Sequence, residues 1–523
     1  MSMHSVSGGD STSPAEGSDQ PFFDPVVYGN GPDDNVTDTA ETAAVTHHTI
    51  TIDGNDIPYT ATAGHLVTVD PSTSLPNAKM FYVAFTKDAQ QEETRPVTFF
   101  YNGGPGSSAV FVLLGSFAPR RIKTKMPDFT PPAPYSMEDN PDSLIDTSDL
   151  VFVNPVGTGY SAAVAPHKNR DFWGVDQDAE SLKQFIKRYL TKTHRWNSPK
   201  FLFGESYGTA RSCVLAYKLH EDGVDLNGVT LLSSILDYRQ SGNPIGLLPT
   251  AAADAWYHKR LGITPPPADL DTFMAEVEEF AVGDYLTALQ AFPKFDPAVL
   301  DKLAAYTGID KIVLTSWSLY IGWPFLTTLL QDRNRAVGAY DGRVTGIDSG
   351  IAGKVDPNSG GNDPTMAAVS GVYTAMWNWY LEEQLQFTSD SAFTDLNDQV
   401  FLHWDYSHVD PTGAKQGPDS FYTAGDLAAV MAINVDLKVL SANGYYDFVT
   451  PQFQTVLDLQ QMPLDDPAIR QNLSIRFYQS GHMVYLDGHS RTALKQDLVQ
   501  LYDVVTSDRA AMSRILTLWQ SKG

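Results

Sequence analysis

Residues 200–208 read KFLFGESYG, and they join a short apolar run, a sharp turn and the start of a helix in nine positions. The run 200–203 has the character of a buried strand, and helix-forming residues follow at 209–219. The five residues between them match the pattern G-x-S-x-G. In a strand-turn-helix context this pattern holds the serine in a strained, exposed bend. The sequence therefore predicts Ser206 as a nucleophile rather than an ordinary turn serine.

Short apolar runs on both sides of this motif predict further strands. They cover residues 48–52, 57–62, 80–85, 97–101, 150–153, 229–232, 437–440 and 475–478. Amphipathic helix patterns alternate with the later strands; one apolar stripe is formed by Leu182, Phe185, Ile186, Tyr189 and Leu190, and another by Leu494, Leu498, Leu501 and Val505. Strands that alternate with helices indicate a mostly parallel sheet with helices on both faces, which is an α/β fold.

The chain divides into four stretches by composition. Residues 1–45 are rich in Ser, Gly, Asp, Pro and Thr, and we expect a mostly flexible acidic tail. Residues 46–237 and 428–523 carry the strand and helix patterns of the core. Residues 238–427 break that rhythm with Trp-, Tyr- and Leu-rich helical segments between Pro- and Gly-rich turns, so we expect a helical cap insertion. No repeat of fixed period is present, which disfavours a solenoid or propeller.

Composition and charge exclude several classes of protein. Of 523 residues, 42% are hydrophobic and 19% are charged, which is typical of a globular chain. The 36 Lys and Arg against 62 Asp and Glu give a net charge of −26, so we expect neither nucleic acid nor membrane partners. The single cysteine, Cys213, excludes an intramolecular disulfide and a multi-cysteine metal site. The sequence start lacks a basic and apolar leader, and the longest apolar run is far shorter than the ~20 residues of a membrane span, so we expect a cytoplasmic protein.

A serine nucleophile needs two partners that can be sought in the sequence. Its hydroxyl is weakly nucleophilic at neutral pH, so a histidine must take its proton and a carboxylate must orient that histidine. After the G-x-S-x-G pattern these partners come in the order acid, then histidine. Asp447 follows the predicted strand 437–440, and His482 follows the predicted strand 475–478. Both therefore lie at carboxyl ends of strands, where open α/β sheets collect their active sites.

A glycine-rich run, NGGPGSS, follows the predicted strand 97–101 and could supply fixed backbone donors for an oxyanion. With it, five motifs in order resemble the serine carboxypeptidase family, peptidase S10. They are NGGPGSS (102–108), VNPVGTGYS (153–161), GESYG (204–208), DFVTP (447–451) and GHMV (481–484). The resemblance covers roughly residues 48–505 and is closest to a bacterial-like member without disulfides. It implies an α/β-hydrolase fold with a mostly parallel central sheet, helices on both faces and a large helical cap insertion.

The resemblance also implies roles for individual residues. Ser206 looks like the nucleophile, His482 the general base and Asp447 the acid that orients it. Gly104 and Tyr207 would donate the two oxyanion-hole amides. The activity implied is release of C-terminal amino acids from peptides through an acyl-enzyme on Ser206, without a metal or organic cofactor.

A second set of residues matches the positions that bind the substrate's terminal carboxylate in this family. They are Asn102, Gly103 and Glu205, with the glutamate protonated so that it can donate a hydrogen bond. The implied partners are therefore peptides with a free C-terminus. The family's second glutamate aligns near Ser116, so one cause of a raised glutamate pKa is missing, and we expect substrate binding to decline at a lower pH than in relatives with both acids.

One further position departs from the family pattern, and several basic residues have a structural interpretation. The family's usual cysteine after the glycine-rich run is Ser107, so sensitivity to thiol reagents should be absent there. Arg120 and Arg121 are solvated or structural in the simpler interpretation, and a role in holding a carboxylate is the alternative. The histidines at other positions lack the placement of a general base and are interpreted as structural; they include His47, His48, His403, His408 and His489.

Two alternative functions remain open from the sequence. A related esterase or acyltransferase could use the same triad, because the triad fixes acyl chemistry but not the leaving group. Such an enzyme would need neither Asn102 nor a proton on Glu205. A catalytically silent hydrolase fold used as a binding module is the third possibility, and the intact set of Ser206, Asp447 and His482 disfavours it.

Overall fold

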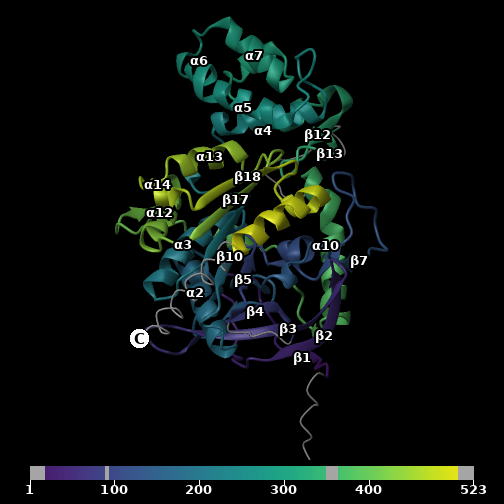
Figure 1. Cartoon of the computed structure of the whole chain (residues 1–523), viewed down its shortest axis with the longest axis vertical. Coiled ribbons are helices and arrows are strands. Elements are labelled where there is room, and N and C mark those ends of the chain that lie inside the picture. Colours follow the sequence, from purple (N-terminus) through teal and green to yellow (C-terminus); the bar gives the residue numbers. More distant parts are fainter. Residues whose placement is uncertain (1–17, 89–93, 349–362, 504–523) are drawn as a thin grey trace, which may run out of the picture.

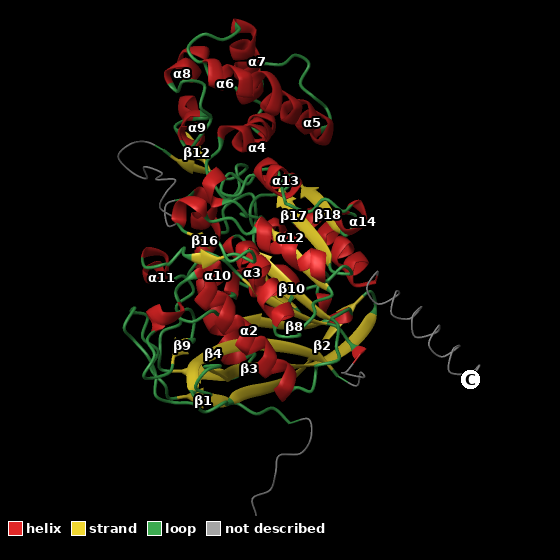
Figure 2. Ribbon diagram, turned by 90° about the vertical axis from the view of Figure 1, so that its left-hand side faces the viewer, coloured by secondary structure: helices red, strands yellow, loops and turns green. Residues whose placement is uncertain are grey.

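A ten-stranded sheet forms the centre of the computed structural model, which describes residues 18–88, 94–348 and 363–503 (Figures 1 and 2). The strand order is β18-β17-β11-β10-β5-β8-β4-β3-β2, and the short β9 pairs with β4. The strands are β2 (Ala43–Ile52), β3 (Asn55–Val69), β4 (Pro76–Lys87), β5 (Val97–Tyr101), β8 (Asp149–Val153), β9 (Ala162–Ala163), β10 (Lys200–Glu205), β11 (Gly228–Leu232), β17 (Lys438–Gly444) and β18 (Leu473–Tyr478).

The sheet has a parallel and an antiparallel part. The six strands β8, β5, β10, β11, β17 and β18 run parallel, whereas β2, β3 and β4 form antiparallel pairs and β4 joins β8 antiparallel. Every strand predicted from the sequence belongs to this sheet, and only the two-residue β9 was missed. Of the six parallel strands, β18 at the end of the sheet is partly exposed, and β8, β5, β10 and β11 are wholly buried, as expected of strands covered on both faces. Their carboxyl ends therefore meet at one edge.

Helices cover both faces and separate two apolar cores. One face packs against α2 (Val175–Lys192), α3 (Tyr207–Glu221) and α12 (Ala424–Ile433). The other face packs against α1 (Val110–Val112), η2 (Leu113–Phe117), α10 (Pro364–Glu383) and the helical residues 488–503. The predicted amphipathic helix at 182–190 is α2, and the predicted C-terminal stripe is confirmed as far as Leu501, because Val505 lies outside the described residues.

A third apolar core belongs to the helical insertion, which stands above the sheet at the top of Figure 1. Its helices are α4 (Pro244–Tyr257), α5 (Leu270–Phe280), η6 (Ala281–Tyr285), α6 (Leu286–Ala291), α7 (Pro297–Thr307), α8 (Lys311–Ser316) and α9 (Pro324–Thr328). No described residue between 238 and 427 adds a strand to the ten-stranded sheet. The fold thus has the expected large helical insertion.

The boundary expected at residue 427 is wrong. The chain returns to the sheet earlier, because α10 buries Val369, Val372 and Tyr373 in the core of one face. Helix α12 likewise packs against α3 in the core of the other face. The raised helical lobe therefore ends before α10. Composition alone did not reveal this, because α10 is rich in Trp, Tyr and apolar residues, like the segments that precede it.

The tail expected over residues 1–45 is also only partly a tail. From residue 18 onward the chain packs on the fold: β1 (Phe22–Asp24) pairs in parallel with β14 (Phe387–Ser389). The hydroxyl of the buried Tyr28 donates to Asp24 at 2.8 Å and lies 3.0 Å from Nε2 of His65. The expectation is wrong for residues 18–45, and residues 1–17 lie outside the described part of the chain.

Short elements complete the described residues. They are β6 (Arg120–Ile122), β7 (Met137–Asp139), η3 (Leu144–Asp146), η4 (Asn169–Phe172), η5 (Tyr238–Gln240), η7 (Gln331–Arg333), β12 (Arg335–Val337), β13 (Thr345–Ile347), α11 (Asp398–Leu402), β15 (His408–Val409), β16 (Lys415–Gln416), η9 (Pro418–Ser420), α13 (Gln452–Gln460), α14 (Pro467–Arg470) and η10 (Val484–Leu486). Among the helices described, none has the length and apolar character required to cross a bilayer.

Candidate active site

Ser206 occupies the sharp bend between β10 and α3. Its φ of 60° and ψ of −127° are strained for a residue with a side chain, and its amide is held by the carbonyl oxygen of Leu232 at 3.0 Å. A Cβ at Gly204 would collide with the carbonyl oxygen of Gly208, so the bend requires a glycine there. Ser206 is partly exposed, whereas β10 before it is buried. The local sequence thus presents one hydroxyl at the carboxyl edge of the sheet.

Asp447 and His482 form a buried pair at the same edge. Nδ1 of His482 lies 2.8 Å from Oδ2 of Asp447, and the two residues are 3% and 0% exposed. The amides of Val449 and Thr450 donate to Oδ1 of Asp447 at 2.9 Å each. The Thr450 hydroxyl also donates to Oδ2 at 2.5 Å. These donors fix the carboxylate, which in turn fixes the ring of His482.

The acid and the base follow two neighbouring parallel strands, β17 and β18, and Ser206 follows β10, with β11 between. Burial disfavours a charged imidazole, but Asp447 outweighs this, so the pKa of His482 is raised above its ordinary value. Among the described residues Ser206 Oγ makes no hydrogen bond to His482. Such bonds are commonly long in the absence of substrate.

The glycine-rich loop 102–108 lies directly against the start of α3. A Cβ at Gly103 would collide with the backbone nitrogen of Tyr207, so only glycine permits this approach. Gly104 has a φ of +102°, which also favours glycine. Tyr207 is the first residue of α3, where amides have no acceptor within the helix. The structure therefore places the backbone of Gly103 against residues 205–208, with Gly104 next in the loop, and the oxyanion-hole roles of Gly104 and Tyr207 stay a prediction.

Glu205 is a buried carboxyl immediately before the candidate nucleophile. It is 3% exposed, and burial raises its pKa to about 7, against the opposing effects of His482, Tyr485 and Asn102. Asn102 is also buried, and its Oδ1 accepts the Val112 amide at 3.0 Å. The structure thus brings Asn102, Gly103 and Glu205 together next to Ser206.

A buried arginine that the sequence analysis did not consider supports this group. Arg211, one turn after Tyr207 on α3, donates to the carbonyl oxygen of Asn102 at 2.5 Å and to Asp178 at 2.5 Å. Its guanidinium lies over the rings of Tyr101 and Tyr207, at 5.4 and 5.1 Å from their centroids. The i, i+4 spacing of Tyr207 and Arg211 on one helix was the only sequence signal that could have indicated the contact between these two side chains.

Ser116 does not face Glu205. Its hydroxyl donates to the carbonyl oxygen of Val112 within the helical turn, and its own carbonyl accepts from Asn140 at 2.7 Å. The partner of Glu205 is instead Tyr485, whose hydroxyl donates to Oε2 at 2.7 Å. Sequence analysis missed Tyr485, and its position three residues after His482 was the only available signal.

The two arginines after Ser116 hold carboxylates of the chain itself. Arg120 donates to Asp139 at 2.5 Å, and Arg121 pairs with Glu138 across the β6–β7 hairpin. This supports the structural interpretation of both.

The remaining histidines and the cysteine lie elsewhere. His47 contacts Asp19, and His48 contacts Thr46. His408 lies between Asp176 and Asp426 in a buried cluster. No three His, Cys, Asp or Glu residues among those described are arranged to hold a metal. Cys213 is buried in α3.

A segment of the insertion, residues 339–343, touches both loops that carry the acid and the base. We name it the brace. The Phe448 amide donates to the Ala339 carbonyl at 2.9 Å, and the Gly342 amide donates to the Tyr446 carbonyl at 2.9 Å. The ring of Tyr340 lies edge-on to the ring of His482, with centroids 5.2 Å apart.

Arg343 extends the brace to the loop after β18. It donates to the Gln479 carbonyl at 2.8 Å and to Asp487 at 2.9 Å, and it is paired through two hydrogen bonds with Asp341. A Cβ at Gly481 would collide with the Tyr340 carbonyl, so this loop and the brace are in close backbone contact. The insertion therefore supports the candidate triad directly.

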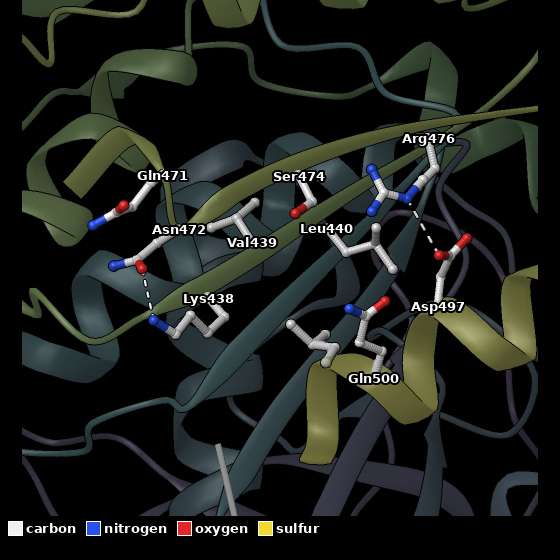
Figure 3. A pocket seen from close by; sticks show the side chains of 10 residues that line it. Lys438, Val439, Leu440, Gln471, Asn472, Ser474, Arg476, Asp497 and Gln500 are labelled. Atoms are coloured by element: carbon white, nitrogen blue, oxygen red, sulfur yellow. Dashed lines mark hydrogen bonds and ion pairs between the residues drawn. The ribbon is translucent and has the colours of Figure 1, made fainter. Parts of the chain in front are cut away.

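A cavity of about 170 Å³ lies at the opposite edge of the sheet (Figure 3). Lys438, the first residue of β17, donates to Asn472 at 2.6 Å there, and Arg476 pairs with Asp497 at 3.2 Å. Asp447 lies past the other end of β17. This cavity is therefore separate from the candidate active site.

Sequence comparisons relate part of this chain to known proteins. Residues 54–248 match the family model of the serine carboxypeptidases, Peptidase_S10. The chain is 26% identical over 189 residues to the lysosomal protective protein of Mus musculus, which is 36% of this chain and 36% of that protein. It is also 26% identical over 174 residues to serine carboxypeptidase-like 1 of Arabidopsis thaliana, 32% and 38% of the two chains. The aligned part thus spans little more than a third of these relatives.

A solved structure supports the fold over more of the chain. The crystal structure of Kex1(delta)p, a prohormone-processing carboxypeptidase from Saccharomyces cerevisiae, superposes with a TM-score of 0.52 and 15% identity, covering 86% of this chain and 91% of that chain. The α/β-hydrolase fold and the resemblance to the serine carboxypeptidases are confirmed. The family match contains Ser206 and ends before Asp447 and His482, and the catalytic roles of all three residues stay a prediction.

Proposed function

Taking this chain as a relative of the serine carboxypeptidases, we propose that it removes the C-terminal amino acid from peptides through an acyl-enzyme on Ser206. His482 takes the proton of the Ser206 hydroxyl as that oxygen attacks the scissile carbonyl. Asp447 holds the imidazole in the tautomer that leaves Nε2 free to accept this proton. The buried His482–Asp447 pair at 2.8 Å supports these roles.

The developing negative charge would fall on the carbonyl oxygen. Backbone donors fixed before the reaction stabilise such a charge without reorganising. We assign this role to the amides of Gly104 and Tyr207; the close approach of Gly103 to the Tyr207 nitrogen and the positive φ of Gly104 support it. His482 then gives its proton to the leaving amine, and the C-terminal amino acid departs. Water, deprotonated by the same histidine, attacks the acyl-enzyme and releases the shortened peptide.

The observation that carries the proposal is the buried Glu205 beside the nucleophile. Its pKa of about 7 means that a neutral carboxyl is present below that pH, and a neutral carboxyl can donate to the substrate's terminal carboxylate. Asn102 offers an amide at the same place. An esterase would have no use for a protonated acid at this position, so exopeptidase specificity is the better account.

The experiment compares blocked dipeptides that differ only at the C-terminus, as free acid and as amide. A carboxypeptidase cleaves the free acid with far higher kcat/KM, and Ser206→Ala abolishes cleavage. Equal rates for the two forms would instead indicate an esterase or general acyl transfer. Titration with a serine-directed phosphonate gives a separate measurement: absence of labelling in the wild type, with no cleavage of any ester or peptide, would indicate a silent binding module.

A further inference from the structure

The hydrogen bond between Tyr485 and Glu205 joins two loops at the candidate carboxylate site. Tyr485 lies in η10, directly after the His482 loop, and its side chain is completely buried. Its hydroxyl donates to Oε2 of Glu205 at 2.7 Å. A neutral tyrosine hydroxyl can supply only one proton, so this bond occupies Oε2 as an acceptor. Asn102 is a second hydrogen-bond partner of this carboxyl, and Oε1 is the oxygen that Tyr485 does not bind.

Two tyrosine side chains occupy the space between turn η2 and Glu205. A Cβ at Gly115 would collide with the ring of Tyr485 and with the hydroxyl of Tyr373. The neighbouring Ser116 directs its hydroxyl to Val112 in its own helical turn. Turn η2 therefore sends no polar side chain to Glu205 from residues 115 and 116, and the two tyrosines fill that space.

Six polar side chains around Glu205 come from five parts of the fold. They are Asn102 of the glycine-rich loop, Tyr340 of the brace, Tyr373 of α10, Asp447 after β17, and His482 and Tyr485 after β18. Of these, His482 and Asp447 are the acid–base pair of the candidate triad, and they bind one another at 2.8 Å.

We propose that Tyr485 is a positioning residue of the substrate carboxylate site, where its hydroxyl holds Oε2 of Glu205 and so directs the carboxyl proton on Oε1 to the substrate's terminal carboxylate. This inference rests on the proposed carboxypeptidase function. Tyr485 need not touch the substrate itself. It fixes the orientation of the acid that does.

The hydrogen bond from Tyr485 to Glu205 affects the pH at which KM for a free-acid peptide begins to rise. Burial raises the pKa of Glu205 to about 7, and the bond from Tyr485 opposes that rise because it stabilises the carboxylate. Above this pH the ionised Glu205 repels a substrate carboxylate, so KM for a free-acid peptide rises. Removing the donor raises the pKa of Glu205 further. The rise in KM should then begin at higher pH.

The experiment measures KM from pH 5 to 9 for one blocked dipeptide as free acid and as amide. The variants are Tyr485→Phe and a matched control, Tyr373→Phe. Tyr373 is an equally buried tyrosine beside Glu205, but its hydroxyl donates to the Phe111 carbonyl at 3.4 Å instead. We expect the midpoint of the KM rise for the free acid to move up by about one pH unit in Tyr485→Phe. Tyr373→Phe should keep the wild-type midpoint, and the amide should show no such rise.

If Tyr485→Phe fails to fold, a second substitution at the same position still tests the inference. Replacement of Tyr485 by 3-fluorotyrosine keeps the ring and makes the hydroxyl a stronger donor, so the midpoint should move to lower pH. A midpoint unchanged in both Tyr485 variants, while the wild type still prefers the free acid, would overturn the inference and leave the proposed function standing. A wild type that treats acid and amide alike would overturn the proposed function first.

Discussion

The backbone amide of His482 donates to the carbonyl oxygen of Tyr340 at 2.6 Å. This bond connects the candidate general base to the brace, a segment of the helical insertion. The loop that carries Asp447 is connected to the same segment through Phe448 and Ala339. Both partners of the nucleophile therefore depend on the insertion for their position, and the insertion does more than cover the site.

Arg343→Lys should lower kcat without a comparable change in KM. Lysine keeps a positive charge beside Asp341. It cannot form all the hydrogen bonds by which the Arg343 guanidinium also reaches Gln479 and Asp487, so the His482 loop loses its fixed position. We expect a loss of about tenfold in kcat, since small displacements of catalytic groups cost up to about 10²-fold. The measurement is steady-state kinetics, with Arg335→Lys on the exposed start of β12 as the control. Equal effects of the two substitutions would argue against a role of the brace.

Ser206→Ala and His482→Ala should each remove nearly all of kcat, on the order of 10⁴-fold or more, and the double variant should be little worse. The reason is that the two side chains act as one unit in proton transfer. Single-turnover assays with a chromogenic acyl substrate provide the sensitivity. Losses that multiply would show that the two residues act independently, contrary to a shared triad.

Glu205→Gln and Asn102→Ala should separate the parts of the carboxylate site. Glutamine keeps a neutral donor at every pH, so the rise in KM as pH passes about 7 should disappear for free-acid peptides. Asn102→Ala should chiefly raise KM, because it removes a donor without changing the triad. The measurement is KM against pH. A variant Glu205→Gln that keeps the alkaline rise would assign that rise to another group.

The buried pair Arg211–Asp178 should respond asymmetrically to substitution. Arg211→Met leaves the Asp178 carboxylate buried without its partner, which costs about 3 to 5 kcal/mol of unfolding free energy. The double variant Arg211→Met/Asp178→Leu should recover most of that stability, but not KM, because the Asn102 carbonyl still lacks its donor. Urea unfolding and kinetics measure the two effects.

The matched control is Arg188→Met, which breaks a partly exposed pair with Glu41. Exposed pairs contribute about 0 to 1 kcal/mol, so this variant should be nearly as stable as the wild type. A similar cost for both arginines would mean that burial is not what makes the Arg211 pair important.

Protonated His408 should stabilise the folded protein, and this contribution should be lost in alkaline solution. Burial disfavours its charge, but the carboxylates of Asp176 and Asp426 outweigh this and raise its pKa to about 9. A raised histidine pKa contributes stability that is fully present below about pH 6.5 and is lost as pH rises to about 9. The contribution is about 3 kcal/mol at most. Tm of the wild type should therefore fall more between pH 6.5 and 9 than Tm of His408→Gln, and parallel declines would contradict the prediction.

The parts of the fold that the sequence predicted are those governed by local pattern. The run 200–208 specifies its own strand, bend and helix, and the apolar strands around it are long enough to be recognised. The errors arose where tertiary packing decides. The polar segment around Asp24 and Tyr28 has no periodicity, yet it is anchored by partners such as His65 and by pairing with β14. Helix α10 resembles the insertion helices in composition but packs on the sheet.

The residues of the candidate site also divide into those that local sequence pattern predicts and those that only tertiary packing brings together. Ser206, Asp447 and His482 follow predicted strands, so the topology of a parallel sheet is sufficient to bring their loops to one edge. Tyr485, Arg211 and Arg343 could not be assigned from the sequence, because each acts through a contact with a distant part of the chain. Position 116 illustrates the limit: the sequence correctly indicated that no acid stands there, but not that a tyrosine 280 residues from Glu205 would be its partner.

That separation along the chain determines the order in which the site can be built during synthesis. At a ribosomal rate of about 5 to 20 residues per second, Tyr485 is added roughly 14 to 56 s after Glu205. The strand and helix around Ser206 can begin to form in this interval, while the base, the acid and the insertion that holds them are still being made. Until β17 and β18 have joined the sheet, Ser206 therefore lacks its proposed acid and base, and we expect no acyl transfer by the incomplete chain.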